Sequence, residues 1–345
     1  PYVRLSIDKG IALPYNPFLD KDKSFSFDDY VKGQVEAGTK DGKIYGMPNY
    51  CGVWGSYYNK DILDKAGLPY PDKETWDIDK YIEAVTKTTK RDENGNLLQA
   101  GLEHFFALEF TLSTAIWSFG AEVCDETRRM CKLSDPLAMD ALQFEADLKW
   151  KYNVMPSAAE STALNTAGGW GIFPSGKSAI KDDGSWFMCC NFDAMGDKFR
   201  WGVMPHWKGP NGKRETFCTT DLWMTNAKTK YPEACWEFLK FVGGPEMNRI
   251  RMVYDHLQPS IKSLSGEWEK LTKEAAVKAN PKQEDLDLSC FIEGYEYARP
   301  MFWWECHTAV MEQLKPIFDQ IYETGKGSVK ELIPPVCERI NKITC

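Results

Sequence analysis

Residues Gly171–Ser178 match the pattern G-x-x-x-x-G-K-[ST], in which backbone N–H groups hold phosphate oxygens at the start of a helix. Two features of the surrounding sequence argue against a nucleotide site. Gly184 follows Ser178 by six residues, which leaves no room for the helix that the motif requires. Pro174 also removes one N–H group from the loop. We therefore treat the match as a coincidence of spacing.

Residues suited to metal binding or acid–base catalysis are present, but their spacing is unfavourable. The four histidines, His104, His206, His256 and His307, are scattered, and none has a second ligand at the spacing of a zinc site. The adjacent carboxylates Asp182-Asp183 are more typical of a solvated turn than of a general acid and base, and no G-x-S-x-G nucleophile motif occurs. We expect no metal, no cofactor and no catalysis.

Eleven cysteines form an odd set, so at least one thiol is free in an oxidised monomer. Cys124 and Cys131 flank a segment that has the character of a hairpin, where opposed positions either form a disulfide or remain two free thiols. Cys189 and Cys190 are adjacent, and we expect two small, partly buried thiols rather than a strained vicinal bridge.

Aromatic residues are the most unusual feature of the composition. The chain has 13 Trp, 15 Tyr and 18 Phe, which together make 13% of its residues. Aromatic faces stack on the C–H faces of sugars, whereas protein cores are built mainly from aliphatic side chains. The alternative is that most of these rings simply pack in the core.

Length and charge narrow the class of protein further. The 345 residues suggest about two domains, and 43% hydrophobic with 27% charged residues is ordinary for a folded protein. The net charge is −8 and no run of Lys and Arg occurs, so we do not expect nucleic acid as a partner. No apolar stretch approaches the roughly 18 residues that span a bilayer.

The chain begins at Pro1, which we interpret as the N-terminus of a processed protein or of a fragment.

Three amphipathic segments predict helices, and short apolar runs between them predict buried strands. The helices are expected to begin at Thr75, at Asp135-Pro136 and at Pro232, each with a suitable cap or first-turn residue. The strands are expected at Ser178–Ile180, Trp201–Met204 and Leu222–Thr225. Alternation of strands and helices indicates an α/β fold.

Several segments, taken in order, resemble the extracytoplasmic solute-binding proteins of ABC sugar importers, the family that contains maltose-binding protein. The segments are G-K-I-Y-G-M-P at 42–48, Y-Y-N-K-D at 57–61, F-P-S-G-K-S-A-I at 173–180 followed by G-S-W at 184–186, K-Y-P-E-A-C-W-E-F-L at 230–239 and A-R-P at 298–300. The resemblance covers nearly the whole chain, and it explains the phosphate-loop match.

This resemblance implies two α/β lobes joined by hinges, with a ligand cleft between them. Lobe 1 would comprise residues 1–50 and 222–297, and lobe 2 residues 53–218 and 300–345, with hinges near 50–53, 217–221 and 296–301. Two departures from the family pattern stand out. The initial βα-βα portion of lobe 1 is absent, so we expect a truncated lobe, and Thr219-Thr220 replaces the common Gly-Gly pair at the middle hinge.

The resemblance also implies candidate ligand-binding residues. Trp186 and Trp303 occupy the family's stacking positions, and Tyr50 and Phe110 occupy cleft positions with a weaker alignment. Asp221 and Glu305 are candidates for binding sugar hydroxyl groups. Core packing of the rings and solvated surface charge are the alternatives. A second group of candidates is Trp54, Trp117, Trp223 and Trp304.

The function implied is capture of a carbohydrate, with an oligosaccharide favoured by the number of aromatic residues, and its delivery to the membrane subunits of an ABC importer. The protein would be a monomer outside the cytoplasmic membrane, as a cell-surface lipoprotein or in the periplasm. Two alternatives remain open. A secreted glycan-degrading enzyme would need two carboxylates roughly 5 to 9.5 Å apart in one cleft, and a polyamine-binding or other small-solute-binding protein would need acidic residues enclosed by aromatic rings.

Overall fold

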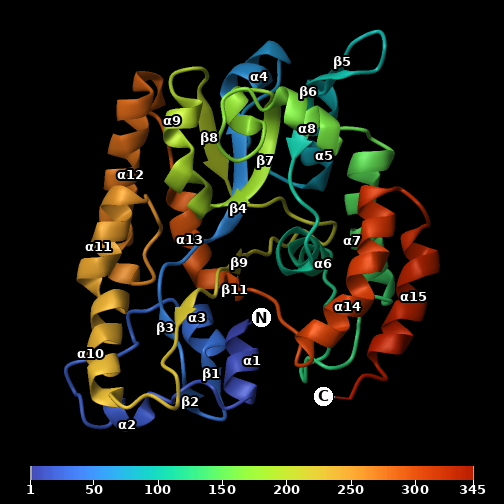
Figure 1. Cartoon of the computed structure of the whole chain (residues 1–345). Helices are drawn as coiled ribbons and strands as arrows, with labels where there is room; N and C mark the ends of the chain where they lie inside the picture. Colours follow the sequence, from blue (N-terminus) through green and yellow to red (C-terminus); the bar gives the residue numbers. More distant parts are fainter. Residues whose placement is uncertain (1, 345) are drawn as a thin grey trace.

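The computed structural model describes residues 2–344 and is built around one five-stranded mixed sheet (Figure 1). The strand order is β5-β6-β7-β4-β8, with β4 antiparallel to both β7 and β8 and β6 parallel to β7. All residues of β4, β7 and β8 are buried, because helices cover both faces. The strands are β4 (Trp54–Asn59), β5 (Lys90–Arg91), β6 (Leu97–Glu103), β7 (Ser178–Gly184) and β8 (Trp201–Met204).

One hydrophobic core lies between this sheet and a group of helices, most of which are drawn on the right of Figure 1, with α4 at the top centre. These helices are α4 (Lys60–Lys65), α5 (Ile78–Thr88), α6 (Ser113–Ser118), α7 (Pro136–Trp150), α14 (His307–Phe318) and α15 (Val329–Ile340), with α8 (Ala158–Leu164) at the surface. The helix expected from Asp135-Pro136 is confirmed as α7. The helix expected near Thr75 is confirmed as α5, but its N-cap is Asp77, whose side chain accepts from the Lys80 N–H.

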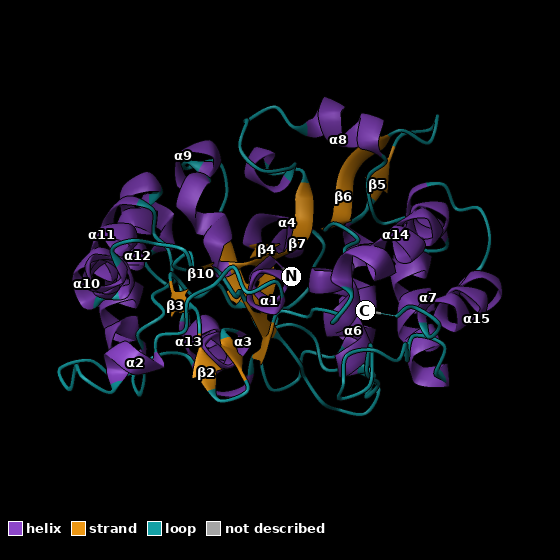
Figure 2. Ribbon diagram, turned by 60° about the horizontal axis from the view of Figure 1, so that its bottom comes forward, coloured by secondary structure: helices purple, strands orange, loops and turns teal. Residues whose placement is uncertain are grey.

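A second core lies on the opposite face of the sheet, against the helices on the left in Figures 1 and 2. These are α9 (Phe192–Met195), α10 (Pro232–Gly243), α11 (Pro245–Tyr254), α12 (Ser265–Ala279) and α13 (Ser289–Tyr297). Helix α10 confirms the prediction from Pro232. In this core Tyr57 of β4 lies 6.0 Å, between ring centroids, from Phe291 of α13. The packing therefore crosses the boundary between the two expected lobes.

Short elements connect these layers. Three two-stranded sheets pair β1 (Thr39–Lys40) with β2 (Lys43–Ile44), β3 (Met47–Pro48) with β10 (Leu222–Trp223), and β9 (Phe217–Cys218) with β11 (Arg299–Pro300). The remaining α-helices are α1 (Tyr2–Asp8), α2 (Asn16–Leu19) and α3 (Lys32–Ala37). Short 3-10 helices lie at Phe173–Ser175, Ser185–Cys190, Lys262–Leu264 and Pro281–Gln283, and π-helical turns at Leu108–Leu112 and Asp319–Glu323. None of the helices within residues 2–344 is long and apolar enough to cross a membrane.

Three local expectations are wrong. Asp182 and Asp183 are not in a solvated turn: they lie within β7, an interior strand between β6 and β4, and are 1% and 4% exposed. The strand expected at Leu222–Thr225 shortens to β10 and is not buried, since Trp223 is 43% exposed. Cys189 and Cys190 form a disulfide where two thiols were expected.

The expected hairpin around Cys124 and Cys131 is present, with these two residues opposite each other. Cys131, however, is bonded to Cys337 of α15, and Cys124 is a free, buried thiol. The partner of Cys131 lies 206 residues away in sequence, and no local pattern indicates it.

Candidate ligand-binding site

The three segments expected to act as hinges lie side by side. Strand β9 runs parallel to β11, and Cys218 of β9 also lies opposite Val53. The Thr219 N–H donates to the Gly52 carbonyl at 2.9 Å, and the Gly52 N–H donates to Thr219 Oγ1 at 2.9 Å. The structure therefore brings segments 50–53, 217–221 and 299–301 together at one place in the fold.

A buried glutamine fastens two of these segments. Gln34 of α3 is fully buried, and its Nε2 donates to the carbonyl of Tyr50 at 2.6 Å and to that of Thr219 at 2.9 Å. Buried backbone carbonyls need such partners, because leaving them unpaired costs about 1–3 kcal/mol each. Sequence reasoning did not identify Gln34, since no short-range pattern links it to either segment.

Trp186 lies beside this junction, immediately after β7. Its ring rests on Gly52 and Gly184, and a Cβ atom on either glycine would overlap the ring carbons. Glycine is thus required at both positions by close approach of the indole. The Trp186 side chain is only partly buried, unlike most aromatic residues around it.

Trp186 belongs to a cluster of aromatic rings. Its ring centroid lies 5.9 Å from that of Trp54, 6.2 Å from that of Phe110 and 6.3 Å from that of Phe217. Trp54 and Phe217 are almost wholly buried, at 1% and 0% exposed, whereas Phe110 is partly buried. We call these four residues the Trp186 cluster: a buried base of two rings carries two partly exposed ones.

Asp221 and Tyr50 are connected to the cluster by Thr219 and Gly52. Thr219 is hydrogen-bonded to Gly52, and Gly52 lies against the Trp186 ring. The pKa of Asp221 is raised by loss of hydration, and hydrogen bonding from Tyr50 and Thr219 partly offsets the rise. Burial raises the pKa of Tyr50, and the neighbouring Asp221 carboxylate raises it further. No Lys, Arg or His among residues 2–344 forms an ion pair with Asp221, which leaves its carboxylate available as a hydrogen-bond acceptor.

Trp303 and Glu305 lie in a different group of side chains. The guanidinium carbon of Arg128 is 3.6 Å from the centre of the Trp303 ring, and that of Arg4 is 5.6 Å away. Arg4 also pairs with Glu305 at 3.5 Å. Trp303 is 7% exposed, so the ring expected to stack on a ligand is covered by arginine in this structure.

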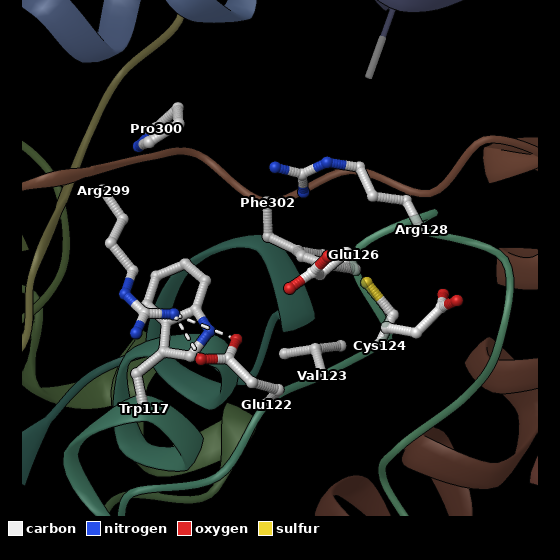
Figure 3. Close-up of a pocket in the computed structure, with 10 residues that line it drawn as sticks. Trp117, Glu122, Val123, Cys124, Glu126, Arg128, Arg299, Pro300 and Phe302 are labelled. Atoms are coloured by element: carbon white, nitrogen blue, oxygen red, sulfur yellow. Dashed lines mark hydrogen bonds and ion pairs between the residues drawn. The ribbon is translucent and has the colours of Figure 1, made fainter.

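A cavity of about 360 Å³ adjoins this group (Figure 3). Figure 3 shows Arg128 and Arg299 entering from opposite sides. Arg299 lies over Trp117, 4.8 Å from the ring centre, and pairs with Glu122 through two contacts of 2.9 and 3.0 Å. The lining residues are Trp117, Glu122, Val123, Cys124, Asp125, Glu126, Arg128, Arg299, Pro300 and Phe302.

The second group of tryptophans is divided. Trp54 lies in the base of the Trp186 cluster, Trp117 lines the cavity, and Trp304 is buried, 5.3 Å between centroids from Phe302. Trp223 is exposed on β10 and donates from Nε1 to Asn49 Oδ1 at 2.9 Å.

Sequence analysis did not predict that Arg4 and Arg128 lie against Trp303. The residues around the two arginines contain no spacing or motif that would have indicated it.

Asp182 is the centre of a buried polar network rather than part of an open site. It accepts from the Tyr81 hydroxyl at 2.7 Å, from Ser56 Oγ, and lies 3.3 Å from His104 Nδ1. His104 Nε2 in turn is 3.3 Å from Glu145. Burial would raise the pKa of Asp182, but the hydrogen bond and charge of His104 and the charge of His206 lower it, whereas burial raises that of Glu145.

Asp183 pairs instead with Lys181 at 3.5 Å, which also contacts Glu103 at 3.1 Å. The two neighbouring carboxylates thus point to different partners, and neither reaches solvent. Within residues 2–344, no group of three or more His, Cys, Asp or Glu side chains is arranged to hold a metal ion.

Comparisons with known proteins agree with this architecture. An ABC substrate-binding protein of Listeria monocytogenes, in complex with cycloalternan, superposes with a TM-score of 0.78 and 19% identity over 99% of this chain and 82% of that one. A Mycobacterium tuberculosis protein, UgpB, in complex with glycerophosphocholine, gives a TM-score of 0.76 and 15% identity over 98% and 80% of the two chains. The chain therefore has the mixed α/β fold of the periplasmic binding proteins.

Sequence comparison finds relatives that are longer than this chain. The arabinooligosaccharide-binding protein of Bacillus subtilis is 24% identical over 245 residues, which are 69% of this chain and 53% of that protein. The chain spans about half the length of the curated relatives that it matches in this way. The model of the bacterial extracellular solute-binding protein family matches residues 3–249. Since this match covers well over half of the chain, the protein belongs to the bacterial extracellular solute-binding protein family.

Proposed function

We propose that the protein binds a carbohydrate, most favourably an oligosaccharide, at the Trp186 cluster and delivers it to the membrane subunits of an ABC importer. The observation that carries this proposal is the partly exposed pair Trp186 and Phe110 on a buried aromatic base. The ring of Trp186 lies on Gly52, whose partner Thr219 is hydrogen-bonded to Asp221. Aromatic faces bind the C–H faces of sugar rings, and a carboxylate has several lone pairs that can accept hydrogen bonds from sugar hydroxyl groups.

The comparisons support a sugar as the ligand. The relative from Bacillus subtilis is named for an arabinooligosaccharide, and the Listeria protein was solved with cycloalternan. The complex of UgpB with glycerophosphocholine supports keeping a small polar solute that is not a sugar within the test.

Ligand binding would act through the three adjacent segments at 50–53, 217–221 and 296–301. In this proposal they are hinges between lobe 1 (1–50 and 222–297) and lobe 2 (53–218 and 300–345). A ligand that contacts both lobes favours the closed state by its differential affinity, and the importer distinguishes closed from open. Trp303 and Glu305 would join the site when Arg128 and Arg4 move from them. We further propose a monomer outside the cytoplasmic membrane, as a lipoprotein or free in the periplasm.

The test is a titration of tryptophan fluorescence and of calorimetric heat with arabino-, malto- and manno-oligosaccharides and with spermidine. A saturable response to one sugar class, weakened at least tenfold by Trp186→Ala and unchanged by Trp170→Ala, supports the proposal. Trp170 is a suitable control because it is 47% exposed and outside the cluster. Chromatography of the sugar after incubation separates binding from hydrolysis: product formation would establish the glycan-degrading alternative, and a response to spermidine alone the polyamine alternative.

A further inference from the structure

Cys124 and Cys131 face each other across the two strands of a hairpin. The Asp125 N–H donates to the Met130 carbonyl at 3.0 Å and the Lys132 N–H to the Val123 carbonyl at 2.9 Å. These bonds flank the cysteines, which makes them a non-hydrogen-bonded antiparallel pair. In such pairs the Cα atoms are about 4.5 Å apart, within the range of about 4.4 to 6.8 Å that disulfides span.

Cys131 is nevertheless bonded to Cys337 of α15, with a Cα–Cα separation of 5.3 Å. Its backbone N–H also donates to Asn341 Oδ1, just beyond α15, at 2.7 Å. One sulfur of the hairpin therefore holds the C-terminal helix, while a free thiol lies opposite on the same hairpin. The backbone therefore places Cys131 where it could form a disulfide either with Cys124 or with Cys337.

We propose that Cys131 is shared between two mutually exclusive partners, and that Cys124 displaces Cys337 from it by thiol–disulfide exchange. The Cys124 thiol loses its proton to solvent and the thiolate attacks Cys131 Sγ. The new Cys124–Cys131 bond forms as the Cys131–Cys337 bond breaks, and Cys337 leaves as a thiolate that takes up a proton. One disulfide and one thiol are present before and after, so no external oxidant or reductant is consumed.

The two pairings differ in what they require of the rest of the chain. The Cys124–Cys131 bond closes a short loop, whose ends meet at low entropic cost even before the protein is folded. The Cys131–Cys337 bond joins residues 206 apart and needs α15 in its docked position. The exchange thus couples the disulfide state to α15: once Cys124–Cys131 has formed, α15 is no longer bonded covalently to the hairpin.

The position of Cys124 also links the exchange to the cavity of Figure 3. Its Sγ faces this cavity, near Arg128 and Phe302, and the segment that contains Phe302 follows β11 (Figure 3). Burial raises the pKa of the Cys124 thiol to about 12. Since only the thiolate attacks, the exchange rate at neutral pH is low and increases about tenfold with each pH unit.

The experiment is disulfide mapping on the full oxidised chain. The protein is incubated without added thiol at pH 7, 8, 9 and 10, quenched with acid, alkylated and digested without reduction, and the partner of Cys131 is identified by mass spectrometry. We expect Cys131–Cys337 to predominate at the start, and the Cys124–Cys131 peptide to form at a rate that increases about tenfold per pH unit. Cys337 should become alkylated in equal amount.

Two variants complete the test. Cys124→Ser must abolish the change, and Cys235→Ser must leave it intact, because Cys235 is a free cysteine on α10, outside the hairpin. Cys337→Ser, oxidised with glutathione disulfide, must form Cys124–Cys131. The proposal is overturned if Cys131 remains with Cys337 at pH 10 in the unaltered chain, or if Cys124→Ser changes at the same rate. Neither result depends on whether the Cys337 variant folds, nor on the identity of the ligand.

Discussion

Arg128 covers the face of Trp303 at 3.6 Å, although the two residues are 175 positions apart and only Trp303 was a candidate from the sequence. Arg128 lies in the turn of the cysteine hairpin with a positive φ of 58°. Its side chain reaches from the hairpin towards the segment after β11 (Figure 3). A cation over an indole contributes about 0.5–2 kcal/mol, depending on burial.

Replacing Arg128 with Gln should therefore lower the free energy of unfolding by about 1 kcal/mol. Gln retains a Cβ atom at the same φ, so the backbone cost does not change and the loss reports on the ring contact. Urea unfolding measures the stability, and acrylamide quenching of fluorescence, compared with and without Trp303→Phe, measures exposure of the indole. The matched control is Arg129→Gln, the next residue, which is exposed. Equal stability of the two variants would contradict the contribution of the stacked pair.

Gly52→Ala should displace the Trp186 ring, because the added Cβ would overlap it. Overpacking of this kind costs about 1–3 kcal/mol. We expect a lower urea midpoint, an altered near-ultraviolet circular dichroism signal and at least tenfold weaker binding of the ligand found by titration. Gly266→Ala is the control, since a Cβ there meets nothing within 4 Å. A native spectrum and unchanged affinity in Gly52→Ala would show that Trp186 does not depend on this close approach.

The sequence predicted elements that are determined locally. Pro136 and Pro232 each begin a helix as expected, because a proline at the first helical position and an amphipathic stripe act within a few residues. The phosphate-loop match failed for an equally local reason, since strand β7 begins at Ser178 where the motif needs a helix. The resemblance to a family added the fold, which local rules do not supply.

The sequence could not predict features that depend on distant partners. Asp182 is buried because Ser56, Tyr81 and His104 supply donors from other elements, 126, 101 and 78 positions away. Two pairs among the predicted candidates do lie together: Trp186 with Phe110 in one aromatic cluster, and Tyr50 with Asp221 at the junction of three segments. Their role in binding stays a prediction. Trp303 and Glu305 lie instead with Arg128 and Arg4, and neither arginine lies in a recognisable motif.

Stability should decrease between pH 7 and pH 5 because of His206. Burial lowers the pKa of His206 to about 4, although the charge of Asp182 opposes the shift. The unfolded chain binds a proton near pH 6.5 while the folded chain does not until about pH 4, so protonation favours unfolding as the pH falls. The expected loss is about 2 kcal/mol at pH 5 relative to pH 7. Burial also lowers the pKa of His256, which acts in the same direction.

Urea unfolding at pH 7, 6 and 5 and constant ionic strength measures this dependence. His206→Asn removes the titrating group, so its stability should vary less with pH even where its absolute stability is lower. A slope identical to that of the unaltered protein would assign the dependence to other groups.

Asp182→Asn should destabilise the protein by about 3 kcal/mol or more, because it removes a buried charge that several donors share. Asp182 accepts from Tyr81, Ser56 and His104, and an amide presents an NH₂ donor to at least one of these donors. Asp140→Asn is the control: Asp140 is exposed on α7, and its replacement should change the free energy of unfolding by no more than about 0.5 kcal/mol.

The same pair of variants distinguishes a structural role of Asp182 from a role in ligand binding. If Asp182 only holds the interior of β7, the folded Asp182→Asn protein retains its affinity for the ligand while its urea midpoint falls, because Trp186 and Asp221 are not among the contacts that are lost. Loss of affinity with an unchanged midpoint would instead place Asp182 in the binding site.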